Sequence, residues 1–170
     1  MRIRTLLRLA TPLLAFAFVL GCADAGPNSG TGPLPTLTDP GFYPLLSEAP
    51  GATGESVVTL SLKQVPGGIE LASVQGEITY DAASLQLARA VLPAGVEGDA
   101  FEVAPGRVRF VGTMMDGVTE PPLLDLVFTG RKGALKREMF TVRFEEVTGG
   151  AEFDDLTATV RSDRLLFQSR

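Results

Sequence analysis

Five acidic residues in the second half of the chain are the side chains that could do acid–base chemistry: Asp116, Glu120, Asp125, Asp154 and Asp155. Glycoside hydrolysis uses two carboxylates at a set separation across a cleft, and the pKa of one is raised so that it can donate a proton. The spacing of the five residues indicates no such pair. Because acidic residues are mostly exposed in folded proteins, we expect these five in solvated turns.

Other catalytic chemistry is limited by the residues that the chain lacks. It contains no His and a single Cys, at position 22. Neither a Ser-His nor a Cys-His pair can form, and zinc would lack its usual nitrogen and sulfur ligands. Calcium prefers oxygen ligands, so Asp154, Asp155 and Asp163 could contribute to a calcium site, but their spacing follows no regular calcium-binding loop. The sequence therefore predicts a protein that is not an enzyme, with no catalytic residue, cofactor or metal site.

The charge of the chain argues against nucleic acid as a partner. After Cys22, 12 basic residues stand against 20 acidic ones, a net charge of −8. Binding to a phosphate backbone depends on Lys and Arg side chains that release counterions, and this part of the chain contains no basic run. We therefore expect no binding to nucleic acid.

The first 22 residues have the pattern of an export signal. Arg2, Arg4 and Arg8 precede an apolar stretch over residues 9–21, which is too short for a permanent membrane span. One interpretation of this pattern is an ordinary secretory signal followed by a chance Cys.

The end of this signal, Val19-Leu20-Gly21-Cys22, resembles the lipobox of bacterial lipoproteins. The resemblance implies that residues 1–21 are a signal peptide and that Cys22 carries the lipid that anchors the protein to a membrane. Residue 23 is Ala rather than the Asp that favours retention at the inner membrane in enteric bacteria. The resemblance therefore implies an outer-membrane protein of the cell envelope that faces an extracytoplasmic space.

Residues 22–40 form a predicted linker between this anchor and the folded domain. Of the 18 residues from 23 to 40, seven are Gly or Pro. The segment has too little apolar surface to offset the entropy cost of ordering its backbone. We therefore expect a flexible tether.

The remainder, residues 41–170, is predicted to be one all-β domain. Short β-rich runs alternate with turn residues, and no long stretch has apolar residues at helical spacing. The predicted strands are 42–47, 55–63, 69–80, 85–91, 100–103, 107–114, 123–129, 139–147, 156–161 and 164–167. About nine short strands separated by turns favour a sandwich of two sheets.

Several local patterns refine this prediction. Pro66-Gly67-Gly68 is a strong turn signal, so the strands 55–63 and 69–80 are predicted to be neighbours. Pro44 cannot donate a ladder hydrogen bond, which places it at an edge or a bulge, and Gly76 within a strand is typical of a bulge.

Tyr80 and Asp81 end the strand 69–80, and each could be interpreted as a binding residue. We expect Tyr80 to be a core or corner residue with its hydroxyl hydrogen-bonded, rather than a platform for a sugar. Asp81 is expected to stabilise the following turn by accepting backbone N–H bonds.

One strand has a candidate recognition face. Alternation over residues 107–115 places Val108, Phe110 and Met114 on one side, towards the core. The opposite side carries Arg107, Arg109, Thr113 and Met115. Arg and Met are enriched at protein interfaces, so these four residues could form a partner-binding face, and an ordinary solvated sheet is the alternative.

The order of short motifs across the domain is distinctive. It comprises Gly51-Ala52-Thr53-Gly54-Glu55-Ser56 before an alternating strand, Gly76-Glu77-Ile78-Thr79-Tyr80-Asp81 with Leu85 four positions later, Gly106-Arg107-Val108, the Leu123 to Phe128 segment, and Phe153-Asp154-Asp155. Over residues 41–168 this order resembles the cohesin domain, the jelly-roll module that holds dockerin domains in cellulosomes and related surface assemblies.

The resemblance implies a nine-stranded jelly-roll sandwich and recognition without catalysis. We therefore expect a binding module that docks a protein partner, such as a dockerin-like domain, through one sheet face in the cell envelope. Polysaccharide binding is an alternative, although with no Trp and two Tyr the chain has few aromatic residues for stacking on sugars. A structural component of the envelope is a third hypothesis.

Overall fold

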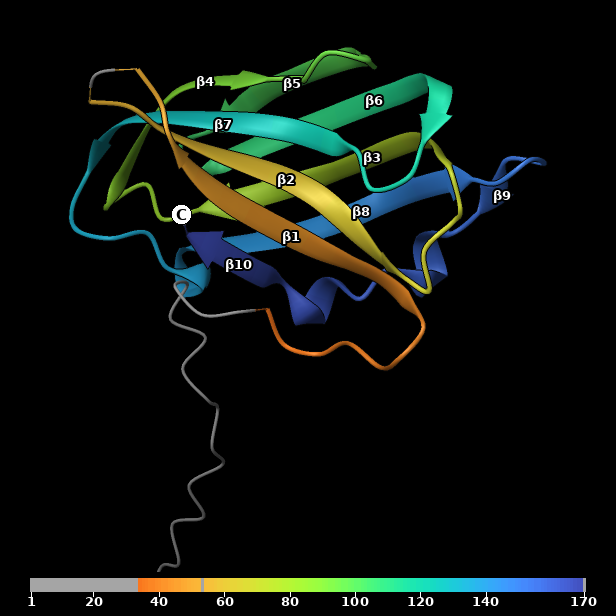
Figure 1. The fold of residues 1–170 in the computed structure, drawn as a ribbon. Helices are drawn as coiled ribbons and strands as arrows, with labels where there is room; N and C mark the ends of the chain where they lie inside the picture. Colours follow the sequence, from red (N-terminus) through yellow and green to blue (C-terminus); the bar gives the residue numbers. More distant parts are fainter. Residues whose placement is uncertain (1–33, 53, 170) are drawn as a thin grey trace, which may run out of the picture.

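The computed structural model describes residues 34–52 and 54–169, which form a sandwich of two five-stranded sheets (Figure 1). The predicted signal peptide, Cys22 and most of the predicted linker lie outside the described residues. The all-β prediction, with two packed sheets in a jelly-roll arrangement, is confirmed. No helix in residues 34–52 and 54–169 is long and apolar enough to cross a membrane.

Each sheet mixes strands that are distant in the sequence. Sheet A contains, in spatial order, β10 (Leu166–Ser169), β1 (Gly41–Pro50), β2 (Ser56–Val65), β7 (Pro122–Arg131) and β4 (Leu85–Val91). Sheet B contains β5 (Val96–Ala104), β6 (Arg107–Val118), β3 (Leu71–Tyr80), β8 (Phe140–Gly149) and β9 (Asp154–Asp155). Three short 3-10 helices lie in the connections: η1 (Arg137–Met139), η2 (Thr157–Thr159) and η3 (Ser162–Arg164). Neighbouring strands are antiparallel except β1 and β10, which are parallel.

The core lies between the sheets and is built by side-chain alternation. In β2 every second residue is buried, including Val58, Leu60 and Leu62, and the residues between them are only partly covered. Because successive side chains of a strand point to opposite faces, this pattern commits one face of each sheet to the core. Burial of large apolar side chains is the dominant favourable term in such a fold.

Aromatic rings join the two sheets across this core. Tyr80 of sheet B meets Phe128 of sheet A edge to face, with ring centroids 5.2 Å apart. Phe140 of sheet B stacks on Phe167 of sheet A at 6.1 Å. Such pairs add roughly 0.5–1.5 kcal/mol each beyond the area that they bury.

The predicted strand 156–161 is wrong. Those residues form η2 and its flanks, with one isolated bridge between Phe42 and Val160. Local side-chain bonds compete with a strand there, because the Oγ1 of Thr159 donates to the carbonyl of Leu156 at 2.6 Å and the backbone N–H of Thr157 donates to Asp155 at 2.9 Å. The other nine predicted strands are present, with β5 and β6 longer than expected.

The predicted pairing of strands 55–63 and 69–80 is also wrong. The first corresponds to β2 in sheet A and the second to β3 in sheet B, and the residues between them cross from one sheet to the other. Packed sheets lie about 10 Å apart, a distance that a five-residue connection spans easily. Both strands alternate in the same way, so their own patterns do not specify which strand each one pairs with.

The two expectations for single residues in strands are met. The pairing of β3 with β8 shifts between Gln75 and Gly76, which confirms the predicted bulge. Pro44 lies in β1 between the bridge at Phe42 and the first β10 pair at Leu45, so β1 has no ladder partner on that side at this position. A residue without a backbone N–H is tolerated there.

Substitution of Gly76 by Ala should destabilise the fold. A Cβ at this position would lie 2.6 Å from the carbonyl oxygen of Arg143 and 2.8 Å from Cζ of Phe110. We expect Gly76→Ala to lower the free energy of unfolding by about 1–3 kcal/mol, measured by denaturant titration. Gly67→Ala is the matched control, because a Cβ there meets no atom within 4 Å. Equal stability of the two variants would contradict the assignment of a crowded bulge.

Candidate functional site

The four residues predicted as a partner-binding face, Arg107, Arg109, Thr113 and Met115, lie together on the outer face of sheet B. Their strand, β6, alternates as predicted, with Val108, Phe110 and Met114 buried in the core. The orientation of the strand is therefore confirmed, and binding by these residues stays a prediction.

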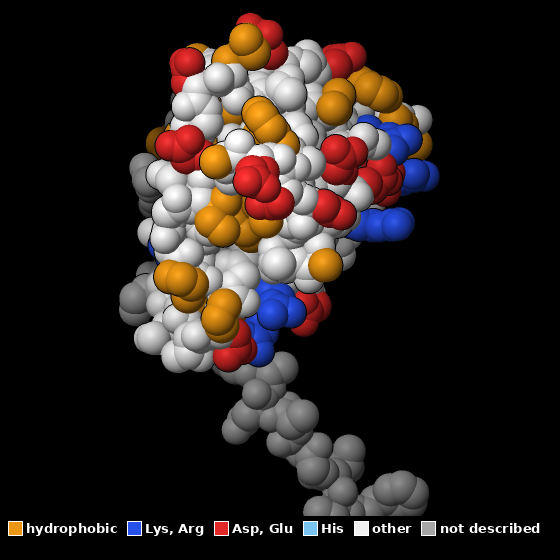
Figure 2. Space-filling model, turned by 90° about the vertical axis from the view of Figure 1, so that its right-hand side faces the viewer, with side chains coloured by type: hydrophobic (Ala, Val, Ile, Leu, Met, Phe, Trp, Pro, Cys, Tyr) orange, Lys and Arg blue, Asp and Glu red, His pale blue; other side chains and the backbone are white. Residues whose placement is uncertain are grey.

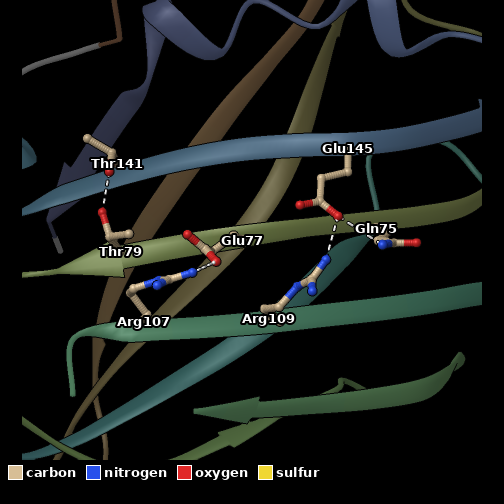
Figure 3. A network of polar contacts seen from close by, with 7 residues as sticks. All are labelled: Gln75, Glu77, Thr79, Arg107, Arg109, Thr141 and Glu145. Atoms are coloured by element: carbon tan, nitrogen blue, oxygen red, sulfur yellow. Dashed lines mark hydrogen bonds and ion pairs between the residues drawn. The ribbon is translucent and has the colours of Figure 1, made fainter. Parts of the chain in front are cut away.

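The outer face of sheet B carries a network of paired polar side chains (Figure 3). Arg107 of β6 donates to Glu77 of β3 at 2.8 Å. Arg109 donates to Oε2 of Glu145 on β8 at 2.6 Å, and the same oxygen accepts from Nε2 of Gln75 at 2.9 Å. The network spans three adjacent strands and pairs each of the two arginines with a carboxylate.

Electrostatics favour the charged state of this network. The hydrogen bond from Arg107 holds the pKa of the Glu77 carboxyl below its usual value, and the charges of Arg107, Arg109 and Arg143 act in the same direction. Arg143, exposed on β8, has no carboxylate within 4.0 Å in the described part of the chain. One positive charge on this face therefore stays available to an acidic group from outside.

Exposed apolar side chains lie beside the network, on β5 and β6. Met115 is 77% exposed, Phe101 is 49% exposed and Val111 is 46% exposed. Phe101 pairs across the sheet with Arg109, and Val111 pairs with Gln75. These apolar residues and the polar side chains around them form what we call the sheet B surface. It consists of Met115, Phe101, Val111, Arg107, Arg109, Glu77, Gln75, Glu145, Arg143 and Thr113.

The outer face of sheet A is different. Its charged groups pair with one another, Glu55 with Arg89 at 3.0 Å and Glu48 with Arg131, and Oγ1 of Thr59 donates to Asp125 at 2.6 Å. Of the large hydrophobic residues that are exposed in residues 34–52 and 54–169, five lie on β5 and β6 and one, Val91, lies on a sheet A strand. The apolar exposure is therefore concentrated on sheet B.

Sequence reasoning missed part of this surface. Val111 follows from the same alternation that gave its four neighbours on β6, so its signal was present. Phe101, Arg143 and Glu145 come from other strands, and only the strand order brings them next to β6. Nothing local in the sequence indicates that order.

The acidic residues considered for catalysis are distributed over several elements. Asp125 lies on β7, Asp154 and Asp155 form β9, and Glu120 follows β6 and accepts from the backbone N–H of Gln64 at 3.1 Å. Asp116 lies within β6. No group of three or more His, Cys, Asp or Glu in the described ranges could hold a metal ion, and this includes the residues considered for calcium.

Tyr80 and Asp81 have the structural roles that were expected. Asp81 Oδ1 accepts the backbone N–H of Ala83 at 3.0 Å, which stabilises the turn after β3. Tyr80 is 8% exposed, and its hydroxyl donates to Oε1 of Glu102 on β5. The same oxygen accepts the backbone N–H of Gly106 at 3.1 Å, so this contact fixes the β5–β6 turn at the edge of the sheet B surface.

The architecture defines a jelly-roll sandwich of two five-stranded sheets. Among solved structures it is similar to the sixth cohesin of scaffoldin B from Acetivibrio cellulolyticus, in complex with a Cel5 dockerin, with a TM-score of 0.52, 18% identity and coverage of 76% of this chain and 99% of that one. It is also similar to a non-cellulosomal cohesin from the archaeon Archaeoglobus fulgidus, with a TM-score of 0.50, 10% identity and coverage of 76% and 91%.

A third similar structure is a type III cohesin module from a cell-surface anchoring scaffoldin of Ruminococcus flavefaciens, with a TM-score of 0.50, 13% identity and coverage of 76% and 88%. The chain therefore has the cohesin fold, as its order of motifs predicted. No protein-family model matches the chain, and no curated protein matches it either.

The Tyr80 hydroxyl should ionise only at high pH. Burial first, and then the hydrogen bond to Glu102, raises the pKa of Tyr80 from 10.0 to about 12. A raised pKa means that the stabilising effect is complete below pH 10 and is lost as the pH rises through about 12. In a Tyr43→Phe variant, which leaves Tyr80 as the only tyrosine, the ultraviolet absorbance of tyrosinate should therefore appear near pH 12.

Glu102→Gln in the same background should move this titration towards lower pH, because the neighbouring negative charge is removed. A titration near pH 10 before that second change would show that the hydroxyl is neither buried nor bonded to Glu102.

Proposed function

We propose that this protein is a non-catalytic docking module of the bacterial cell envelope, which binds a protein partner through the sheet B surface. The observation that carries the proposal is that Phe101, Val111 and Met115 are exposed along β5 and β6, beside a network of Arg and Glu side chains that are already paired. An isolated soluble domain gains nothing from displaying these apolar side chains together, whereas a partner that covers them removes their area from water.

The residue types of the sheet B surface, and the pairing of its charged side chains, suit recognition of a protein. Aromatic, Met and Arg side chains are enriched in protein interfaces, and a few such residues usually contribute most of the binding energy. Because Arg107 and Arg109 are already held by Glu77 and Glu145, less side-chain entropy is lost when a partner binds. We expect the apolar residues to provide affinity and the paired charges to orient the partner.

The proposed partner is a dockerin-like domain. One similar cohesin was solved in complex with a dockerin, and this chain shares its fold at 18% identity. Arg143 has no carboxylate within 4.0 Å in the described part of the chain, so it is suited to an acidic or hydrogen-bond-accepting group on such a partner. Polysaccharide binding and a purely structural role in the envelope are the outcomes that the following experiment can separate from docking.

The docking proposal predicts a large difference between two similar valines. Val111 is 46% exposed on β6 and Val91 is 43% exposed on β4 of sheet A. The purified protein should retain a dockerin-containing protein from extract of its source organism, and purified recombinant dockerin should then bind it in solution. Val111→Glu should weaken that binding at least about tenfold, because a charge would be buried against an apolar contact, and Val91→Glu should have no effect.

The binding should be measured by calorimetry with calcium and with a chelator. Equal affinity of the two valine variants would place the interface elsewhere. Retention of polysaccharide on an array, with no dockerin bound, would replace docking with glycan recognition. If neither binds and crosslinking in intact cells finds envelope proteins, a structural role is correct.

The proposed anchor is a lipid on Cys22, which would place the domain on a bacterial membrane, preferably the outer membrane, facing away from the cytoplasm. Two acyl chains are sufficient for stable attachment, since each buried methylene contributes about 0.8 kcal/mol. Support comes from the arginines, the short apolar stretch and the Val19-Leu20-Gly21-Cys22 motif.

Cys22→Ser should abolish incorporation of a palmitate analogue. The variant should then be found in the soluble fraction or as the unprocessed precursor, instead of as a lipid-anchored protein in the membrane fraction. Metabolic labelling followed by fractionation of cells measures both effects. Ala23→Ser is the matched control and should leave labelling unchanged. Persistent labelling of the Cys22→Ser variant would show that the lipid is attached elsewhere.

A further inference from the structure

A groove of about 430 Å³ lies at one end of the sandwich, between the start of β1, the end of β2, residues 66–69 and η2. Most of its wall is apolar, from Phe42, Val65, Pro66, Ile69 and Leu156. Figure 2 shows this end of the molecule, where hydrophobic side chains are exposed among acidic and basic ones. A mostly apolar groove of this volume, with a few polar groups, is typical of a site for a small ligand. We call it the end groove.

Gln64 is the first polar group of the end groove, and it stands where the fold expects an apolar residue. In β2 the inward positions before it are Ser56 at the strand start and then Val58, Leu60 and Leu62, and Gln64 follows with only 7% of its surface exposed. Its Oε1 accepts the backbone N–H of Ile69 at 2.8 Å, which fixes the orientation of the amide.

The Nε2 of Gln64 has no hydrogen-bond partner among the described residues. No side-chain nitrogen or oxygen that is fully buried in residues 34–52 and 54–169 lacks a partner. Nε2 therefore keeps accessible surface, on a residue that lines the end groove. A donor held on a residue that is more than nine-tenths buried would gain a hydrogen bond from a ligand that carries an acceptor.

Arg161 is the second polar group and supplies positive charge. Its Nη2 donates to the carbonyl of Pro40 at 3.3 Å, and no carboxylate in the described ranges lies within 4.0 Å of it. Arg164, nearby in the sequence, differs because it pairs with Asp39 at 2.8 Å. Gly41 leaves room for the arginine, since a Cβ there would lie 3.2 Å from Nε of Arg161.

We propose that the end groove binds a small amphiphile that has an aliphatic chain and a terminal carboxylate. The chain packs against Phe42, Val65 and Ile69, and the carboxylate accepts hydrogen bonds from Nε2 of Gln64 and from Arg161. The argument for this occupant is charge complementarity, because Arg161 is the one charged residue that lines this mostly apolar groove and no carboxylate of the described residues pairs with it. A peptide is less suited, because each residue would bring a backbone donor and acceptor that need partners, and the lining side chains offer few polar groups.

Calorimetry of the purified protein with decanoate tests the proposal directly. Decan-1-ol and decyltrimethylammonium, each below its aggregation limit, have the same chain length without the negative charge. We expect decanoate to bind at least about tenfold more tightly than either of them, because a hydrogen bond to a charged group contributes more than a neutral one.

Three variants assign the binding to the end groove. Arg161→Gln removes the charge, and Gln64→Glu keeps the acceptor for Ile69 while it replaces the donor with a negative oxygen, so each should weaken decanoate binding about tenfold or more. Ala158→Trp, at an exposed position on the groove wall, should block the site. Lys132→Gln also removes one positive charge but lies outside the groove, and it should leave the affinity unchanged.

Circular dichroism of each variant checks that the fold is intact. Equal binding of the three ligands, or equal loss in the Lys132→Gln and Arg161→Gln variants, would overturn the proposal. Tighter binding of an apolar peptide with a free carboxyl end than of decanoate would also overturn it and assign the groove to a peptide. This test does not involve the sheet B surface, so its outcome is independent of the docking proposal.

Discussion

The whole structure depends on the two-residue period of the β-strand. Successive side chains point to opposite faces, and a shift of one residue would exchange the core face and the solvent face of a strand. In β6, burial of Val108, Phe110 and Met114 therefore also determines that Arg107, Arg109 and Met115 face outward. The candidate surface is thus a geometric consequence of how the core is packed. A shift in the register of β6 would turn the core residues outward and remove the surface.

This period also explains what could be predicted from the sequence. Nine of the ten described strands, the all-β class and the orientation of β6 follow from local alternation and turn residues, which need no knowledge of neighbouring strands. The partners of each strand do not follow in this way, because β2 and β3 have equivalent patterns and still belong to different sheets. The ion pair between Arg109 and Glu145 depends in addition on the bulge at Gly76, which shifts the register of β8. Long-range pairing is set by the fit of the whole core, so a local pattern contains little information about it.

The two outer faces illustrate two uses of charge on a sheet. On sheet A, Glu55 pairs with Arg89, and few large apolar side chains are exposed. On sheet B, pairing of charges is combined with exposed Met115 and Phe101, and no carboxylate of the described residues lies within 4.0 Å of Arg143. Exposed ion pairs contribute little to stability, so the arginines of sheet B are better explained by the positions in which they are held than by the free energy of folding. That reasoning is the physical basis of the proposal that this face recognises a partner.

Gln64 is informative because it departs from the pattern that the rest of the core obeys. A residue at the inward position after Leu62 would normally be apolar, and a buried amide is costly unless its groups are bonded. The bond to Ile69 accounts for the oxygen of this amide but not for its nitrogen. Gln64 is a large polar side chain at an inward position that lines a groove, and a ligand is a physical reason for this exception to the apolar pattern. The same reasoning applied to Tyr80 gives the opposite result, because Glu102 accepts its hydroxyl within the fold and leaves nothing for a ligand to satisfy.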